Sequence, residues 1–128
     1  MVSSTSQPCP CDSQKPYTHC CGPYIERQRD PQSAEALMRS RYTAFCLGNR
    51  DYLMHSWHPD TRPSSLDLDH NARWIGLKIK HTTQGTSDDE EGTVEFVARY
   101  KIAGKAHRLQ ENSYFCRHNG RWVYVSAQ

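Results

Sequence analysis

Long apolar runs and an excess of charge of one sign are both missing from this 128-residue chain. No segment approaches the roughly 18 consecutive apolar residues of a membrane-spanning helix, and the opening MVSSTSQP has neither the basic start nor the apolar run of a secretory signal. Sixteen Lys and Arg against fourteen Asp and Glu give a net charge of +2, which is too weak to indicate nucleic acid or a membrane as a partner. We therefore expect a soluble cytoplasmic protein with one core.

Signatures of nucleotide binding and of serine hydrolases are missing too. The chain has no glycine-rich phosphate loop and no serine nucleophile elbow. Cysteine is scarce outside one short segment, because only Cys46 and Cys116 lie beyond the stretch CPCDSQKPYTHCC. We interpret these two as small buried or edge residues and not as nucleophiles.

The remaining four cysteines, Cys9, Cys11, Cys20 and Cys21, all lie in that stretch. In a reducing compartment so tight a cluster favours a metal site over disulfides, which are the alternative interpretation. Proline and turn-forming residues flank both cysteine pairs, so the chain can fold back around one ion. Four thiolates with no open position are typical of structural zinc, and we predict Zn²⁺ here. His19 is the one rival ligand, in place of Cys20 or Cys21.

The cysteine spacing, together with Ser13, Lys15 and Tyr17 between the pairs, resembles the SEC-C zinc motif. One departure is Asp12, where the motif commonly has glycine; aspartate tolerates left-handed backbone better than most residues. SEC-C motifs are associated with docking to protein partners. The resemblance therefore implies that this zinc knuckle, residues 1–27, contacts a protein partner.

The rest of the chain, residues 28–128, predicts two helices followed by four strands. An apolar stripe spaced by three and four residues predicts a helix that begins behind Asp30 or Ser33 and ends at Gly48. A second, shorter helix is expected to run through Trp57 and to end before Pro59. Alternating patterns in RWIGLKIKH and TVEFVARY predict the first two strands, and two more follow.

Turn residues set the expected pairing of these strands. Asn119–Gly120 predicts a two-residue hairpin between the last two strands, and a turn at Gly104–Lys105 would place Ala98 opposite Glu111. The two registers place the same residues on the inward face of the sheet. These are Val94, Phe96, Ala98, Tyr100, Leu109, Glu111, Ser113, Phe115, Arg117, Trp122 and Tyr124.

Helices followed by an antiparallel sheet with one apolar face predict an α+β architecture, with the N-terminal helices packed on the sheet. The order resembles the cystatin-like fold of the NTF2-like superfamily. More narrowly, the segments LMRSRYTAF, GTVEFVARY and NGRW resemble the YchJ family, in which such a body follows a SEC-C motif. This resemblance covers nearly the whole chain. It implies a curved sheet with a small pocket and leaves room for a homodimer, but it implies little about biochemistry.

Six residues are candidates for lining such a pocket: Arg41, Trp57, His58, Glu111, Arg117 and Trp122. Glu111 is the anomaly, because a carboxylate on an inward face needs a partner or a raised pKa. The structural interpretation is a buried ion pair between Arg41 and Glu111 that docks helix on sheet. The functional interpretation is a carboxylate at the wall of an open pocket, poised as a general base.

These inferences together predict a zinc-binding adaptor protein. Its knuckle would contact a protein partner, and its NTF2-like body would offer a pocket for a small molecule. The alternative is a small-molecule enzyme of the isomerase or dehydratase type that uses Glu111, helped by His58 or Arg41; it rests on fold-level analogy.

Overall fold

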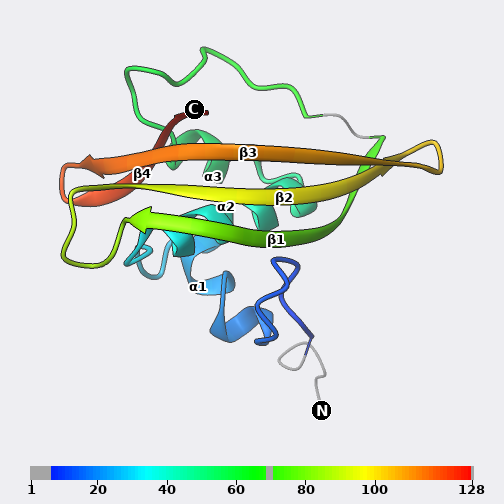
Figure 1. The fold of residues 1–128 in the computed structure, drawn as a ribbon, viewed down its shortest axis with the longest axis horizontal. Coiled ribbons are helices and arrows are strands. Elements are labelled where there is room, and N and C mark those ends of the chain that lie inside the picture. Colours follow the sequence, from blue (N-terminus) through cyan, green and yellow to red (C-terminus); the bar gives the residue numbers. More distant parts are fainter. Residues whose placement is uncertain (1–6, 69–70, 128) are drawn as a thin grey trace.

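Short helices come first and a four-stranded sheet follows in the computed structural model, which describes residues 7–68 and 71–127. The elements are the 3-10 turn η2 (Tyr17–His19), helices α1 (Gly22–Ile25), α2 (Ala34–Leu47) and α3 (Arg50–His55), and strands β1 (Ala72–Gln84), β2 (Glu91–Ile102), β3 (Lys105–His118) and β4 (Arg121–Ala127). The strands are antiparallel in the order β1-β2-β3-β4 (Figure 1). The predicted α+β architecture is confirmed. The first six residues of the predicted knuckle lie outside the described residues.

Helix α2 packs against the inner face of the sheet and is buried on most of its circumference (Figure 1). Its ends follow the expected caps. The Ser33 hydroxyl accepts a hydrogen bond from the Ala36 amide, and Gly48 ends the helix in left-handed backbone with φ of 69°.

No helix in the described part of the chain is long and apolar enough to cross a membrane.

The segment after α3 pairs with the last strand instead of continuing as a helix. Helix α3 ends at His55, so the prediction that it runs through Trp57 is wrong. The Tyr124 amide donates to the Ser56 carbonyl, and the His58 amide donates to the Tyr124 carbonyl, both at 2.8 Å. This parallel bridge satisfies backbone groups that a helix would have used, and it places Trp57 directly beside Tyr124.

The register between β2 and β3 differs from the predicted one by two residues. Ala98 lies opposite Leu109, not Glu111, because the turn is made by Ala103 and Gly104. Both turn residues have positive φ, 53° and 78°, which a type I′ hairpin requires, and glycine then occupies the second turn position, as in Asn119–Gly120. An even shift keeps each side chain on its face, so the predicted inward set still shares one face. The hairpin at Asn119–Gly120 has the predicted register.

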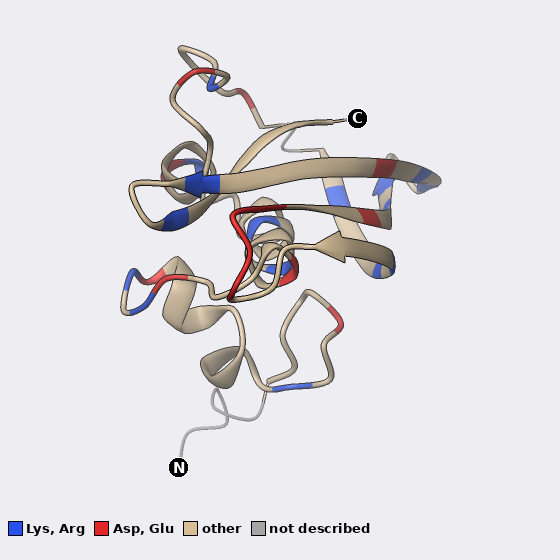
Figure 2. Ribbon diagram, turned by 60° about the vertical axis from the view of Figure 1, so that its left-hand side comes forward, with Lys and Arg blue, Asp and Glu red and all other residues tan. Residues whose placement is uncertain are grey.

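Charged residues are dispersed over the molecule. Figure 2 shows Lys and Arg interspersed with Asp and Glu over most of the ribbon, apart from one continuous acidic stretch at Asp88–Glu91. This distribution agrees with the weak net charge of +2 read from the sequence.

The turn between β1 and β2 requires glycine at position 92. A Cβ atom on Gly92 would lie 2.4 Å from the Cα atom of Gly85, so backbone atoms would have to move. We expect Gly92→Ala to lower the free energy of unfolding by about 2 kcal/mol or more, as overpacking against backbone does. The matched control is Gly76→Ala in β1, whose Cβ would meet only the Asp12 carboxylate at 3.6 Å. Urea unfolding of both variants tests this; equal stabilities would contradict it.

Candidate functional site

The four clustered cysteines converge on one point. Their Sγ atoms all lie within 4.8 Å of one another, and the cluster includes no histidine among the described residues. The Sγ atoms of Cys11 and Cys20 are 3.6 Å apart, and those of Cys20 and Cys21 are 3.9 Å apart. Four sulfurs bound tetrahedrally to zinc at about 2.3 Å would be about 3.8 Å from each other. The donor set and its spacing therefore fit one tetrahedral metal ion, and His19 is exposed outside it.

The thiols of this cluster change one another's pKa through hydrogen bonds and charge. Hydrogen bonds from Cys11 and Cys21 hold the pKa of Cys9 far below its usual range, while hydrogen bonds with Cys11 and Cys9 raise the pKa of Cys21. Burial raises the pKa of Cys20 to about 11. Without a cation, the cluster cannot hold four thiolates, because each negative charge disfavours the next. A divalent ion would remove this conflict, since coordination deprotonates a thiol.

Helix α2 supplies contacts around the cysteines. The Thr43 hydroxyl lies 3.6 Å from the Sγ atom of Cys9, and Arg39 donates to the Cys11 carbonyl at 2.8 Å. From within the knuckle, the Ser13 hydroxyl lies 3.0 Å from the Sγ atom of Cys20. Such surrounding donors orient metal ligands and offset their charge. The contacts from α2 could not be predicted from the sequence, because they join segments far apart in the chain.

Asp12 joins the knuckle to the sheet. Its backbone is left-handed with φ of 63°, and its carboxylate accepts a hydrogen bond from the Leu77 amide at 3.2 Å. This amide follows a bulge in β1. A glycine at position 12 would suit the backbone but could not make this bond, which explains the departure from the motif. Cysteines of the knuckle also share the hydrophobic core with α2, so the knuckle and the body are packed as one unit.

A cleft of about 430 Å³ lies between the knuckle and the start of α2, and we call it the knuckle cleft. It is lined by Ser13, Lys15, His19, Cys20, Cys21, Tyr24, Ser33, Glu35, Ala36 and Arg39. Of its cations, Arg39 is already paired with Glu35 at 3.0 Å. Lys15 and His19 are exposed, and Lys15 is the cation of this surface that has no ion pair among the described residues.

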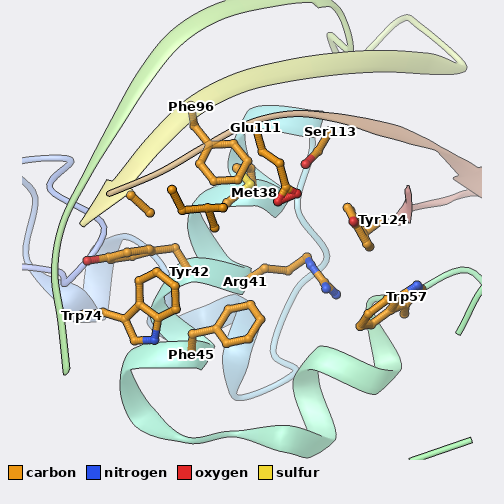
Figure 3. Close-up of a pocket in the computed structure, with 12 residues that line it drawn as sticks. Met38, Arg41, Tyr42, Phe45, Trp57, Trp74, Phe96, Glu111, Ser113 and Tyr124 are labelled. Carbon is orange, nitrogen blue, oxygen red and sulfur yellow. The ribbon is translucent and has the colours of Figure 1, made fainter. Parts of the chain in front are cut away.

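A second cavity, of about 280 Å³, lies between α2 and the inner face of the sheet (Figure 3). It is lined by Met38, Arg41, Tyr42, Phe45, Trp57, Trp74, Phe96, Ala98, Leu109, Glu111, Ser113 and Tyr124. Most of these side chains are apolar or aromatic, and Arg41, Glu111 and Ser113 add polar groups. We call this space the sheet cavity.

Arg41 is a buried cation held in a fixed orientation. Its side chain is 5% exposed, and its Nη1 atom donates to the Leu53 carbonyl at 2.9 Å and to the Ser56 hydroxyl at 2.7 Å. The guanidinium lies over the rings of Trp57 and Tyr124, at 5.0 and 4.5 Å from their centroids. Burial lowers the pKa of Arg41 to about 10, so the group still carries its charge at neutral pH.

Glu111 lies at the cavity wall without a close counter-ion. Arg41 makes no ion pair within 4.0 Å among the described residues, so the predicted Arg41–Glu111 clamp is not formed. The two side chains face the same space with a gap between them (Figure 3). Burial raises the pKa of Glu111, and the positive charge of Arg41 only partly opposes this. The cavity is therefore not closed by a salt bridge between helix and sheet.

Three of the six pocket candidates lie elsewhere. The ring of His58 is 4.8 Å from that of His118, and its Nδ1 atom accepts a hydrogen bond from the Asp60 amide. Arg117 donates to the carbonyls of Asp89 and Ser87, and it covers the ring of Trp122 at 4.7 Å. The indole of Trp122 is buried and donates to the Gln32 carbonyl. His58 is therefore corrected to a turn residue, Arg117 to a β3 residue that contacts the loop before β2, and Trp122 to a core residue. Arg41, Trp57 and Glu111 do line the cavity.

Sequence reasoning missed most of the cavity wall. Trp74, Tyr42 and Phe45 pack together, with ring centroids 5.9 and 5.7 Å from that of Trp74, and we call them the aromatic wall. Tyr42 and Phe45 belong to the predicted apolar stripe, but the sequence does not say which part of the stripe stays uncovered. The parallel bridge that brings Trp57 to Tyr124 had no sequence signal either.

Two family models match this chain. One describes the middle NTF2-like domain of YchJ and matches residues 33–127; the other is the SEC-C motif and matches residues 6–23. Among curated relatives, a UPF0225 protein of Chromobacterium violaceum is 51% identical, covering 93% of this chain and 90% of its own. A UPF0225 protein of Bordetella pertussis is 47% identical, covering 99% and 98%.

Two solved structures share the fold. The solution structure of a SEC-C motif containing protein from Rhodopseudomonas palustris superposes with a TM-score of 0.84 at 33% identity, covering 95% of this chain and 98% of that one. The crystal structure of a SEC-C motif containing protein from Psychrobacter arcticus gives a TM-score of 0.79 at 25% identity, covering 98% and 84%. The predicted NTF2-like fold, preceded by a four-cysteine motif, is confirmed.

Proposed function

The chain belongs to the YchJ (UPF0225) family, and from this premise we propose that it is a zinc-containing binding protein with two binding surfaces. The knuckle cleft contacts a protein partner, and the sheet cavity binds a small molecule. The observation that carries the proposal is the sheet cavity itself: its side chains leave about 280 Å³ open around a buried arginine that lacks a counter-ion among the described residues. Such a concave, mostly apolar space with a few convergent polar groups is the usual form of a ligand site.

Zinc is the ion that best suits the knuckle. It prefers four thiolates in tetrahedral geometry, and a four-cysteine shell leaves no open position for substrate, which supports a structural role. Cysteines of the cluster also belong to the hydrophobic core, so the ion would stabilise the body as well as the knuckle.

We expect the purified, reduced protein to contain one zinc ion per chain, measured by inductively coupled plasma mass spectrometry. Cys11→Ser should lose the metal and lower Tm by about 10 °C, since a loss of roughly 2–3 kcal/mol has that effect in a chain of this size. Cys116→Ser is the matched control, because Cys116 is a free cysteine in β3 outside the cluster and should keep the metal. The proposal would be contradicted if the wild-type protein contained no metal and the Tm of Cys11→Ser equalled that of the wild type.

The partner of the knuckle cleft is expected to present acidic residues. The exposed side chain of Lys15 adds positive charge to the cleft, whereas Arg39 is neutralised by Glu35. Complementary charge at the rim of an interface mainly sets the association rate and the choice of partner. The SEC-C motif at residues 6–23 supports the same surface.

Charge reversal tests this surface without disturbing the core. In quantitative affinity capture, the Lys15→Glu variant should no longer retain a protein that the wild type retains. The affinity for that protein should fall about ten-fold or more, while the Tm of the variant stays unchanged. Lys101→Glu is the control, because Lys101 is equally exposed but lies on β2, away from the cleft. Identical protein sets for both variants would refute a partner at the cleft. Deletion of residues 1–24 is a poor test, since it would remove part of the core.

A small-molecule enzyme is the second candidate, and the free carboxylate of Glu111 favours it. Partial burial raises the pKa of Glu111, and a carboxylate whose pKa is raised is a stronger general base. Within the described part of the chain, His58 is not placed to exchange a proton with Glu111, because its ring faces His118 and lies outside the cavity lining. Arg41 is the remaining group that could stabilise developing negative charge.

Our proposal predicts that small molecules captured from a metabolite mixture are recovered unchanged, as measured by mass spectrometry. An enzyme would instead convert one of them, and Glu111→Gln would slow this conversion about a hundred-fold or more. Glu95→Gln is the control, because Glu95 lies on the opposite face of the sheet, where Gln110 donates to it. Conversion by wild type and Glu95→Gln, but not by Glu111→Gln, would establish the enzyme and overturn the binding-only proposal.

A further inference from the structure

The polar groups of the sheet cavity gather at one end. Figure 3 shows Arg41, Glu111 and Ser113 directed toward the same space, with the aromatic wall to the other side of Arg41. Ser113 is 2% exposed and lines this end of the cavity. The cavity therefore has a polar end and an apolar end.

Arg41 has donors that the protein leaves unused. Its Nη1 atom is satisfied by α3, which explains why the side chain is held in place. Its Nε and Nη2 atoms donate to no acceptor in the described part of the chain. These N–H groups form one edge of a planar fork that matches a carboxylate. The rings of Trp57 and Tyr124 lie on neighbouring sides of the guanidinium, since their centroids are 5.0 and 4.5 Å from its carbon but only 5.1 Å from each other. The edge formed by Nε and Nη2 is the part of the guanidinium left for a ligand.

A docking role alone does not account for this arginine. A buried cation without a counter-ion is costly, and the two hydrogen bonds to α3 could be made by a neutral donor. Glu111 is the only carboxylate among the described residues that line the cavity, yet it forms no ion pair with Arg41. The gap between them is where an anionic group of a ligand would complete the site.

We propose that the sheet cavity binds a small monocarboxylate with an aromatic or alicyclic body, whose carboxylate accepts hydrogen bonds from Arg41 and whose apolar part packs on the aromatic wall. This inference rests on the proposed small-molecule function of the cavity and names the class of ligand. Ser113 donates a further hydrogen bond to the carboxylate. Glu111 lies beside it as the neutral acid and donates through its own O–H, because an anion at this position favours protonation of a neighbouring carboxyl.

The charge balance limits the ligand to a single negative charge. One arginine faces the space, and the carboxyl of Glu111 lies beside it. A phosphate dianion would exceed the single positive charge and would be repelled by any ionised Glu111. An amine would be repelled by Arg41, and the neutral Glu111 of this arrangement would offer it no counter-charge. The apolar lining then selects a carboxylate whose remaining atoms are hydrophobic.

The experiment uses matched probe sets that differ only in the head group. Benzoate, phenylacetate and cyclohexanecarboxylate are compared with their primary amides and with benzylamine and phenethylamine, by NMR titration of the zinc-loaded full chain. The indole N–H signals report the location of binding. Those of Trp57 and Trp74 should shift because both residues line the cavity, whereas that of Trp122 should not, because it bonds to the Gln32 carbonyl elsewhere.

We expect at least one carboxylate to bind about ten-fold or more tightly than its amide, as a charge-assisted hydrogen-bond pair requires. Arg41→Met should abolish this preference, and Arg41→Lys should keep part of it, because lysine retains the charge without the fork. Ser113→Ala should weaken the carboxylate about three-fold or more, which provides a test if Arg41→Met does not fold. Glu111→Gln should bind the carboxylate as well as wild type or better.

The outcomes separate the two proposals. If amides or amines bind at the cavity tryptophans as tightly as the carboxylates, the ligand class is wrong while the small-molecule function stands. If none of the probes shifts the signals of Trp57 or Trp74, the inference of a carboxylate ligand fails, and the small-molecule function is decided by the capture from a metabolite mixture. Carboxylate binding that survives Arg41→Met unchanged would also overturn the assignment of Arg41.

Discussion

Helix α2 is buried on two sides at once, and both sites depend on this double burial. Toward the knuckle it presents Arg39 and Thr43, which contact Cys11 and Cys9. Toward the sheet it presents residues that line the cavity, Arg41 among them. An isolated helix of this length would be only marginally stable in water. The helix is therefore stabilised and positioned by the knuckle on one side and the sheet on the other. Removing either neighbour would leave one face of α2 in water.

The cysteine cluster and the faces of the sheet could be predicted from the sequence because local rules control them. Cysteine spacing determines which sulfurs can meet, and strict alternation sorts side chains to two faces regardless of an even shift in register. The two-residue error at Ala103 and Gly104 illustrates the limit. Either placement of glycine in the turn was compatible with the pattern, and the need for positive φ at both turn residues decided it.

The contacts that make the sites could not be predicted, because they join segments distant in the chain. Nothing near Asp12 in the sequence indicates that its carboxylate would accept from the Leu77 amide. Likewise, the segment predicted to end a helix forms a parallel bridge instead, in which Trp57 pairs with Tyr124. This bridge places both rings against the Arg41 guanidinium. The anomalous Glu111 was visible from its inward position, but its partner was not, since an ion pair depends on an exact approach between helix and sheet that periodicity does not encode.

Arg41 shows why an apparent docking residue can also be a binding residue. Its hydrogen bonds to the Leu53 carbonyl and the Ser56 hydroxyl hold α3 against α2, and the same bonds stop the guanidinium from turning toward Glu111. The orientation that stabilises the helix pair therefore leaves the charge uncompensated at the cavity. Since rigid, preoriented donors lose little entropy on binding, this arrangement favours recognition over flexibility. The knuckle, which contacts the same helix through Arg39 and Thr43, thus helps to fix one wall of the cavity as well as its own metal ligands.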